Sequence, residues 1–174
     1  MQNDKKVKDI MTGIFDYPHI PYWFSIGQAI RIVKASFIKP KKYPSPMVIL
    51  VFNEKYNLLG TISLKNILKG LEPKIYGKEA KVQVEEKNTG APSRIEWDAL
   101  FDKEAKELAL RQVSEIMVPI EKFVQPEDPV KKAAHIMLSH DAYVLPVLEN
   151  KKKLVGIVRI IELFDEISND ILKE

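Results

Sequence analysis

Two segments of this chain repeat one another, and this internal duplication limits the folds that the chain can adopt. The first, residues 7–11, reads VKDIM and returns at residues 113–117 as VSEIM. The second, residues 51–60, aligns without gaps with residues 147–156, and both stretches end in glycine. The first copy is longer because it contains FIKPKKYPSP, which neither a helix nor a central strand accepts. A duplicated chain of 174 residues predicts two small units that pack on each other.

Each copy is expected to fold in the order strand, helix, strand, strand, helix. Short leading strands are expected near Phe15 and Phe123. Ser25 is expected to cap the first helix of copy one, and Asp128, followed by Pro129, that of copy two. The strand pairs are predicted over residues 47–52 and 58–62 and over residues 143–148 and 154–158, and the closing helices over about 63–71 and 159–167. A unit of about 60 residues has a marginal core, so packing between the units should stabilise both.

A further amphipathic helix is expected in the connector between the copies. Ser93 and Glu96 form a predicted capping box, and the helix over about residues 94–111 carries an apolar stripe with Trp97 and Phe101. Such a stripe must be covered. We expect it to lie against its own chain, with a homodimer or a partner protein as the alternative cover.

These features resemble a tandem CBS-domain pair, with motifs at residues 7–72 and 113–172 and a connector at 73–112. The resemblance implies an α/β (α+β) fold in which two βαββα motifs are related by a pseudo-two-fold axis. It implies adenosyl ligands such as AMP, ADP, ATP or S-adenosylmethionine in clefts between the motifs, and a regulatory role without catalysis. It also implies a homodimer, and an unidentified protein target is possible.

The family's ligand signature runs from glycine through a hydroxyl residue to an acidic or amide residue. In the first copy it is matched by Gly60, Ser63 and Asn66, with Thr61 as a mild departure. Physically, a serine at a helix start offers donors to a phosphate, helped by the helix dipole, and the Asn66 oxygen can accept from a ribose hydroxyl. The alternative is that Ser63 only caps the helix and Asn66 is a polar residue of its first turn.

The second copy keeps the glycine but has Arg159 where the hydroxyl belongs and Glu162 at the acidic position. The guanidinium could donate to a phosphate while the carboxylate holds the ribose; the alternative, which we favour, is a surface ion pair. The resemblance adds base contacts from the strand motif with Tyr143 and Pro146, and from the segments after each methionine, which include Ile14 and Ile120.

Composition excludes several other classes of function. A formal charge of +3 is too small to indicate nucleic acid, and there is no apolar stretch that predicts a signal peptide or a membrane span. Cysteine is absent, which suits the cytoplasm, and the three histidines have no metal-ligand spacing. We therefore expect no catalytic residues, no metal and no obligatory cofactor. The expected function is a sensor that binds an adenine nucleotide or adenosyl ligand and signals to a partner; the alternative is a dimerisation or docking module without nucleotide.

Overall fold

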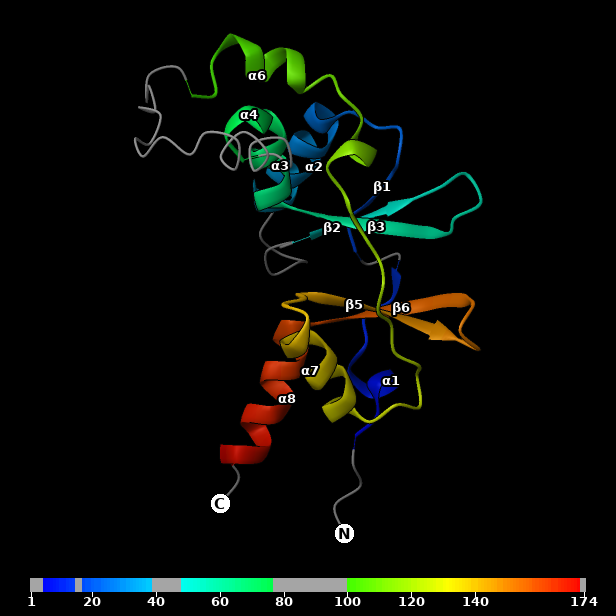
Figure 1. Ribbon diagram of the computed structural model, residues 1–174. Helices are drawn as coiled ribbons and strands as arrows, with labels where there is room; N and C mark the ends of the chain where they lie inside the picture. Colours follow the sequence, from blue (N-terminus) through cyan, green and yellow to red (C-terminus); the bar gives the residue numbers. More distant parts are fainter. Residues whose placement is uncertain (1–4, 15–16, 39–47, 77–99, 173–174) are drawn as a thin grey trace, which may run out of the picture.

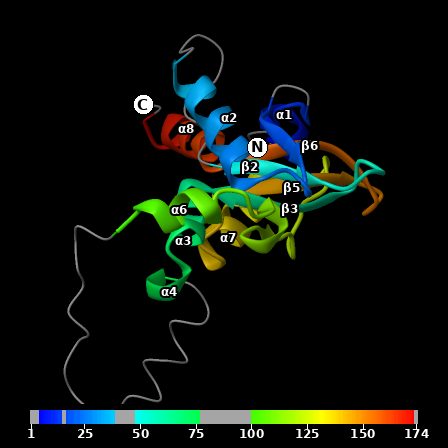
Figure 2. The ribbon, with the colours of Figure 1, turned by 90° about the horizontal axis from the view of Figure 1, so that it is seen from above.

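The computed structural model of the protein describes residues 5–14, 17–38, 48–76 and 100–172. They form two lobes, each made of a β-sheet with helices packed outside it, and the two sheets face each other in the middle of the molecule (Figure 1). Viewed from above, the strands of one sheet lie over those of the other (Figure 2). This layered α/β architecture confirms the fold class predicted from the duplicated sequence.

Lobe 1 is built around a four-stranded sheet in the order β1-β2-β3-β4, in which only β1 and β2 run parallel. Ser25 caps its first helix as expected, since the Ser25 hydroxyl accepts from the Gln28 N–H and the Gln28 side chain accepts from the Ser25 N–H. The elements of lobe 1 are β1 (His19–Pro21), α2 (Ile26–Ile38), β2 (Val48–Phe52), β3 (Leu58–Ser63), α3 (Leu64–Leu71), α4 (Pro73–Tyr76), α6 (Lys103–Leu108), a 3-10 helix (Val113–Glu115) and β4 (Val118–Pro119).

Lobe 2 has an antiparallel pair of strands, β5 (Val144–Glu149) and β6 (Lys153–Arg159), covered by helices α1 (Val7–Ile10), α7 (Val130–Ser139) and α8 (Ile160–Leu172). The expectation that Asp128 caps α7 is wrong. The helix begins one residue later, after Pro129, and the Asp128 carboxylate instead accepts from the Gln125 N–H at 2.9 Å and from Lys132 Nζ at 2.8 Å. It therefore closes the turn before the helix.

The leading segment of each sequence copy packs in the lobe of the other copy. Thr12, which follows α1, exchanges two backbone hydrogen bonds with Ile157 of β6, at 2.8 and 2.9 Å. In the same way β4 pairs with β3, so residues of the second copy extend the sheet of lobe 1. Val7 is fully buried in the core of lobe 2, and Val113 in that of lobe 1. Each lobe is thus completed by the opposite copy.

Glycine at equivalent positions of β3 and β6 permits this crossing. A Cβ atom on Gly60 would lie 2.5 Å from the carbonyl oxygen of Val118, and one on Gly156 would lie 2.8 Å from that of Thr12. The Cβ position of Gly60 also lies 3.2 Å from the sulfur of Met117, and that of Gly156 lies 3.2 Å from the sulfur of Met11. The repeated glycine and the repeated methionine therefore meet across the two copies, which explains why the pattern occurs twice.

The two lobes also share a detail of strand geometry and a common core. Each strand pair has a register shift at the equivalent place, between Val51 and Phe52 in one lobe and between Val147 and Leu148 in the other. Each lobe has its own apolar core, and a third cluster fills the space between the sheets. The buried members of this third cluster are Tyr17, Val48, Leu50, Phe52, Val144 and Ile157.

The connector packs on lobe 1 through a short helix. Within the described residues α6 spans only Lys103–Leu108, and Phe101 has a φ of 59°, which a right-handed helix excludes. The predicted helix over 94–111 is therefore shorter in its described part. Carbonyls that follow α6 accept from the first N–H groups of α2, at 2.8 Å from Gly27 and 2.9 Å from Ile26. Trp97 and Ser93 lie outside the described residues, as do Phe15 and the stretch 39–47.

Candidate functional site

The start of α3 carries the two first-copy residues that match the ligand signature. The Ser63 hydroxyl accepts from the Asn66 N–H at 3.1 Å and donates to the Asn66 side-chain oxygen at 2.6 Å. The same oxygen accepts from the Ser63 N–H at 2.8 Å. This is a complete capping box, so the capping interpretation of Ser63 and Asn66 describes this structure. Both side chains are half-buried, at the end of β3.

The start of α8 has the same arrangement with charged residues. The Glu162 carboxylate accepts from the Arg159 N–H at 3.0 Å and from Arg159 Nε at 2.7 Å. The Ile160 N–H donates to the Tyr143 carbonyl at 2.9 Å, so the residue that precedes β5 lies beside the start of α8. The expected ion pair is present, but it is not on the surface, because the two side chains are only 15% and 19% exposed. The hydrogen bonds with Glu162 fix the orientation of this partly buried guanidinium.

Tyr17 joins the two helix starts across the lobes. Its ring is 4% exposed and lies under the Arg159 guanidinium, at 5.9 Å from the ring centre. Burial raises the pKa of Tyr17 to about 12, although Arg159 and a hydrogen bond from the Val48 backbone both favour the ionised form. Val48 in turn pairs with Ser63 in the lobe 1 sheet. A continuous set of contacts therefore runs from Ser63 to Arg159 along one edge of the interface.

Sequence reasoning did not single out Tyr17. It lies in an aromatic-rich stretch, residues 15–24, whose composition says nothing about which of its rings faces the other lobe. Only the crossing of the chain between the lobes brings Tyr17 beneath a residue that lies far from it in sequence.

The other expected contact residues lie at different positions along the strands, between the helix starts and the hairpin turns. Tyr143 lies at the helix-start edge and is half exposed. Thr61 and Pro146 lie further along the sheets, where Thr61 pairs with Leu50 and the buried Pro146 pairs with Ile157. Two more lie toward the hairpin turns: the Ile120 N–H donates to the Leu59 carbonyl at 3.2 Å, and Ile14 lines a pocket beside the turns. The helix-start edge thus gathers five of the nine: Ser63, Asn66, Arg159, Glu162 and Tyr143.

The arrangement at this edge suits an anionic ligand. Two helix N-termini, a hydroxyl and a covered guanidinium can all donate to a phosphate or a carboxylate. Among the described residues there is no group of three histidines, aspartates or glutamates that could hold a metal. The described helices include none that is long and apolar enough to cross a membrane.

Residues 113–169 match the family model of the CBS domain. None of the curated proteins matches the chain. The match covers most of the second sequence copy and begins at the crossing segment that completes the sheet of lobe 1.

Solved structures share the fold at low sequence identity. CBSX2 of Arabidopsis thaliana in complex with AMP is 16% identical with a TM-score of 0.62, over 95% of this chain and 98% of that one. The CBS-domain pair of MJ0100, solved with 5'-methylthioadenosine and S-adenosyl-L-methionine, is 17% identical with a TM-score of 0.60, over 97% and 99%. The cytosolic domain of the Mg²⁺ channel MgtE with ATP is 20% identical with a TM-score of 0.59; the alignment covers 94% of this chain but only 49% of that one.

Proposed function

Because residues 113–169 match the CBS domain and the chain shares the fold of solved CBS-domain pairs, we propose that it is a tandem CBS-domain protein, a regulatory module that binds an adenine nucleotide or another adenosyl ligand between its lobes. The observation that carries the proposal is the edge at which two equivalent helix starts meet, linked by Tyr17. Similar structures hold AMP, ATP and S-adenosyl-L-methionine, which supports an adenosyl group as the shared part of the ligand. Proteins with this fold generally regulate and do not catalyse.

The capping boxes are compatible with a ligand at the same place. The Ser63 hydroxyl can keep accepting from the Asn66 N–H while its proton turns from the Asn66 oxygen to a phosphate. The freed oxygen can then accept from a ribose hydroxyl. At the other start, a phosphate that replaces Glu162 as a partner of Arg159 would leave the carboxylate free for the ribose.

Signalling follows from where the ligand binds. A ligand that contacts both lobes shifts the balance between their arrangements by the difference in its affinity for them. Tyr17 and Arg159 come from opposite lobes, so a ligand that displaces their contact changes how the lobes are held together. We propose that a partner protein reads this change in the cytoplasm, a location that the absence of cysteine fits.

Calorimetric titration with AMP, ATP and S-adenosylmethionine tests the proposal. We expect at least one of them to bind with a Kd below about 1 mM. The double variant Ser63→Ala/Asn66→Ala should weaken binding about tenfold, which is about 1.4 kcal/mol, if the α3 start is the occupied one. The corresponding variant at the α8 start is Arg159→Ala/Glu162→Ala.

The capping box of α2 supplies a matched control for this experiment. The variant Ser25→Ala/Gln28→Ala removes the same type of cap, worth roughly 0.5 to 2 kcal/mol of stability, at a helix start outside the proposed site. It should leave the affinity unchanged. Equal loss of affinity in the control, or no binding by any of the three ligands, would refute the adenosyl site.

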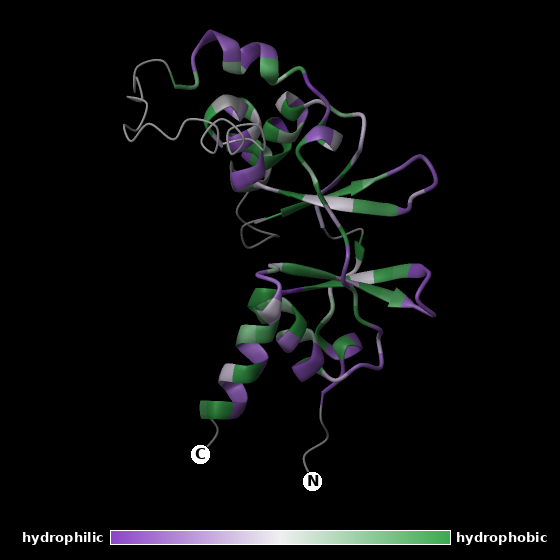
Figure 3. Ribbon diagram, viewed as in Figure 1, coloured by the Kyte–Doolittle hydropathy of each residue, from purple (hydrophilic) through white to green (hydrophobic). Residues whose placement is uncertain are grey.

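A second function, self-association, is favoured by the apolar surface of α7 and α8. Leu138, Phe164 and Ile171 are 76%, 67% and 74% exposed, and a groove of about 350 Å³ lies between the helices. Apolar residues recur along the whole of α8 (Figure 3). We propose that a second copy of the chain covers this face. Sedimentation should give a dimer for the wild type and a monomer for Phe164→Glu; a wild-type monomer at high concentration would exclude the dimer.

A further inference from the structure

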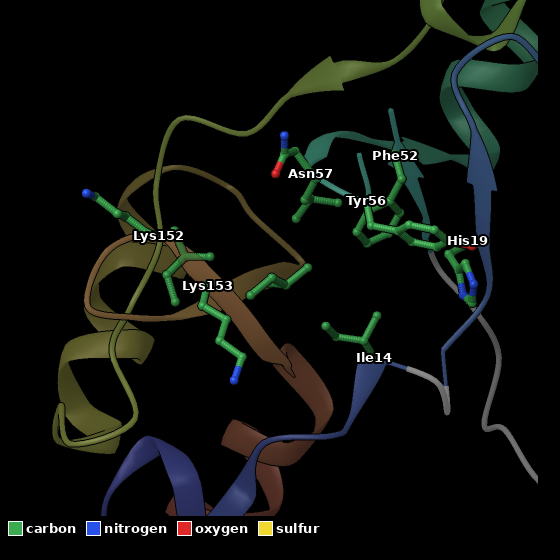
Figure 4. A pocket seen from close by; sticks show the side chains of 10 residues that line it. Ile14, His19, Phe52, Tyr56, Asn57, Lys152 and Lys153 are labelled. Atoms are coloured by element: carbon green, nitrogen blue, oxygen red, sulfur yellow. The ribbon is translucent and has the colours of Figure 1, made fainter. Parts of the chain in front are cut away.

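A pocket of about 540 Å³ opens between the two lobes at the end opposite the helix starts. It lies between the turn that joins β2 to β3 and the turn that joins β5 to β6, so both hairpins contribute to its wall (Figure 4). Its volume is within the range of roughly 300 to 1,000 Å³ found for small-molecule sites. The proposed adenosyl contacts include one of its lining residues, Ile14.

Equivalent positions of the two sequence copies line this pocket from opposite sides. Phe52 and Leu148 correspond in the ungapped alignment of the copies, and so do Leu58 and Leu154. The pocket therefore lies on the approximate two-fold axis, where a chain with two identical copies would have a symmetric wall. Together with Ile14, these four side chains make an apolar floor continuous with the core between the sheets.

The rim breaks this symmetry in a chemically specific way. Where lobe 1 has Tyr56 and Asn57, the equivalent positions of lobe 2 are Lys152 and Lys153. One wall is therefore aromatic and amide, and the other is lined by two lysines, of which Lys152 directs its ammonium group away from the other lining residues (Figure 4). The Tyr56 side chain is exposed, and within the described part of the chain Lys153 forms an ion pair with Glu149 at 4.0 Å.

Both turns are fixed by local geometry, so the rim is preorganised. The Asn53 side-chain oxygen accepts from the N–H groups of Lys55 and Asn57, both at 2.9 Å, and Tyr56 adopts a left-handed φ of 57°. In the other hairpin Asn150 and Lys151 have φ values of 51° and 59°. A turn held in this way loses little conformational entropy when a ligand binds.

The pocket is separate from the helix-start edge. Along β6 the hairpin end, at Leu154, and the helix start, at Arg159, are five residues apart, which is roughly 16 Å at about 3.3 Å per residue. Tyr17 and the buried cluster between the sheets fill the space between these two ends. We therefore expect a nucleotide held at a helix start and a molecule in this pocket to be bound together, with Ile14 as the one residue named for both.

We propose that this pocket is a second ligand site that takes a small aromatic anion. The apolar floor and the Phe52 ring, which meets the His19 ring edge-on at 5.8 Å, accept the aromatic body. The long, flexible side chains of Lys152 and Lys153 turn toward the acidic group and hold it at the rim. The ligand lies on the axis between the lobes, so it holds the two hairpins in one arrangement.

A pair of fluorescent probes of nearly the same shape tests this site. 8-Anilinonaphthalene-1-sulfonate carries an anionic group, and N-phenyl-1-naphthylamine is its neutral counterpart. We expect Lys152→Glu/Lys153→Glu to weaken binding of the sulfonate at least tenfold and to leave binding of the neutral probe within about twofold. The matched control Lys65→Glu/Lys69→Glu makes the same charge change on α3 and should alter neither affinity. Thermal melting checks that each variant is folded.

Two further measurements locate the probe. Amide chemical shifts should change at the hairpin residues 52–58 and 148–154, and saturating AMP should leave the sulfonate bound. Shift changes confined to the α7 and α8 groove, equal weakening by the control variant, or release of the sulfonate by AMP would each overturn the proposal. Failure of AMP, ATP and S-adenosylmethionine alike to bind would refute the adenosyl site and leave this one standing.

Discussion

The crossing of the two copies predicts that alanine at Gly156 destabilises the fold. Its Cβ would stand 2.8 Å from the Thr12 carbonyl oxygen, whereas carbon–oxygen contacts are ordinarily roughly 3.3 to 3.6 Å. The crossing strand must therefore move by about half an ångström. That strand is held by two hydrogen bonds to Ile157, at 2.8 and 2.9 Å, which the movement weakens.

The magnitude follows from three contributions. Overpacking a well-packed core costs roughly 1 to 3 kcal/mol, and each weakened hydrogen bond costs up to about 1 kcal/mol. Alanine offsets roughly 0.5 to 1 kcal/mol, because it restricts the unfolded chain and this glycine has no positive φ. We therefore expect Gly156→Ala to lower the free energy of unfolding by about 2 to 3 kcal/mol.

Urea unfolding followed by circular dichroism measures this loss, and amide exchange at Thr12 and Ile157 should become faster in the same variant. Gly27→Ala is the control, because its Cβ meets its nearest atom at 3.3 Å and alanine favours the helix by about 1 kcal/mol. The control should change stability by less than about 1 kcal/mol in either direction. A loss below about 0.5 kcal/mol at Gly156, or an equal loss at Gly27, would refute this reasoning.

Two pH-dependent variants test the electrostatics at the interface and at the start of the chain. Tyr17→Phe removes the hydrogen bond with Val48 and should lower the free energy of unfolding by about 1 kcal/mol at pH 8. The pKa of Tyr17 is raised to about 12 in the folded protein, so the wild type loses roughly 2 to 3 kcal/mol of stability as pH rises from 10 to 12. The variant lacks this loss and should therefore be the more stable of the two in alkaline urea titrations. Lys6 and Lys8 lower the pKa of Glu127 to about 2, so its contribution to stability is present above pH 4.5 and disappears as pH falls toward 2. Glu127→Gln should therefore flatten the loss of stability with acid, and an unchanged acid profile would contradict that pairing.

The sequence alone was sufficient for the features that are local or repeated. Hydrophobic periodicity and the repeat predicted the order of helices and strands, and the capping residues Ser25 and Ser63 mark helix starts that the structure confirms. Such features depend on neighbours within a few residues. For the same reason the residues that begin α3 and α8 could be predicted. The sequence did not decide whether their side chains cap the helix and pair with each other or contact a ligand.

Features that depend on long-range pairing were not predictable. An alignment of the two copies does not say whether residues 7–11 pack on their own copy or on the other, because both choices bury the same apolar side chains. The partial burial of the Arg159 and Glu162 pair was unpredictable for the same reason, because Tyr17 of the opposite lobe packs against it. The hairpin pocket requires two turns about a hundred residues apart to meet, and neither turn alone carries a binding motif.

The most direct measurement is a crystal structure of the protein grown with AMP. The account predicts that the phosphate lies within hydrogen-bond distance of Ser63 or Arg159, at the start of α3 or α8, with the ribose beside Asn66 or Glu162. Nucleotide density away from both helix starts would contradict it, as would the absence of density for AMP, and equally for ATP and S-adenosylmethionine, at saturating concentration with both capping boxes intact.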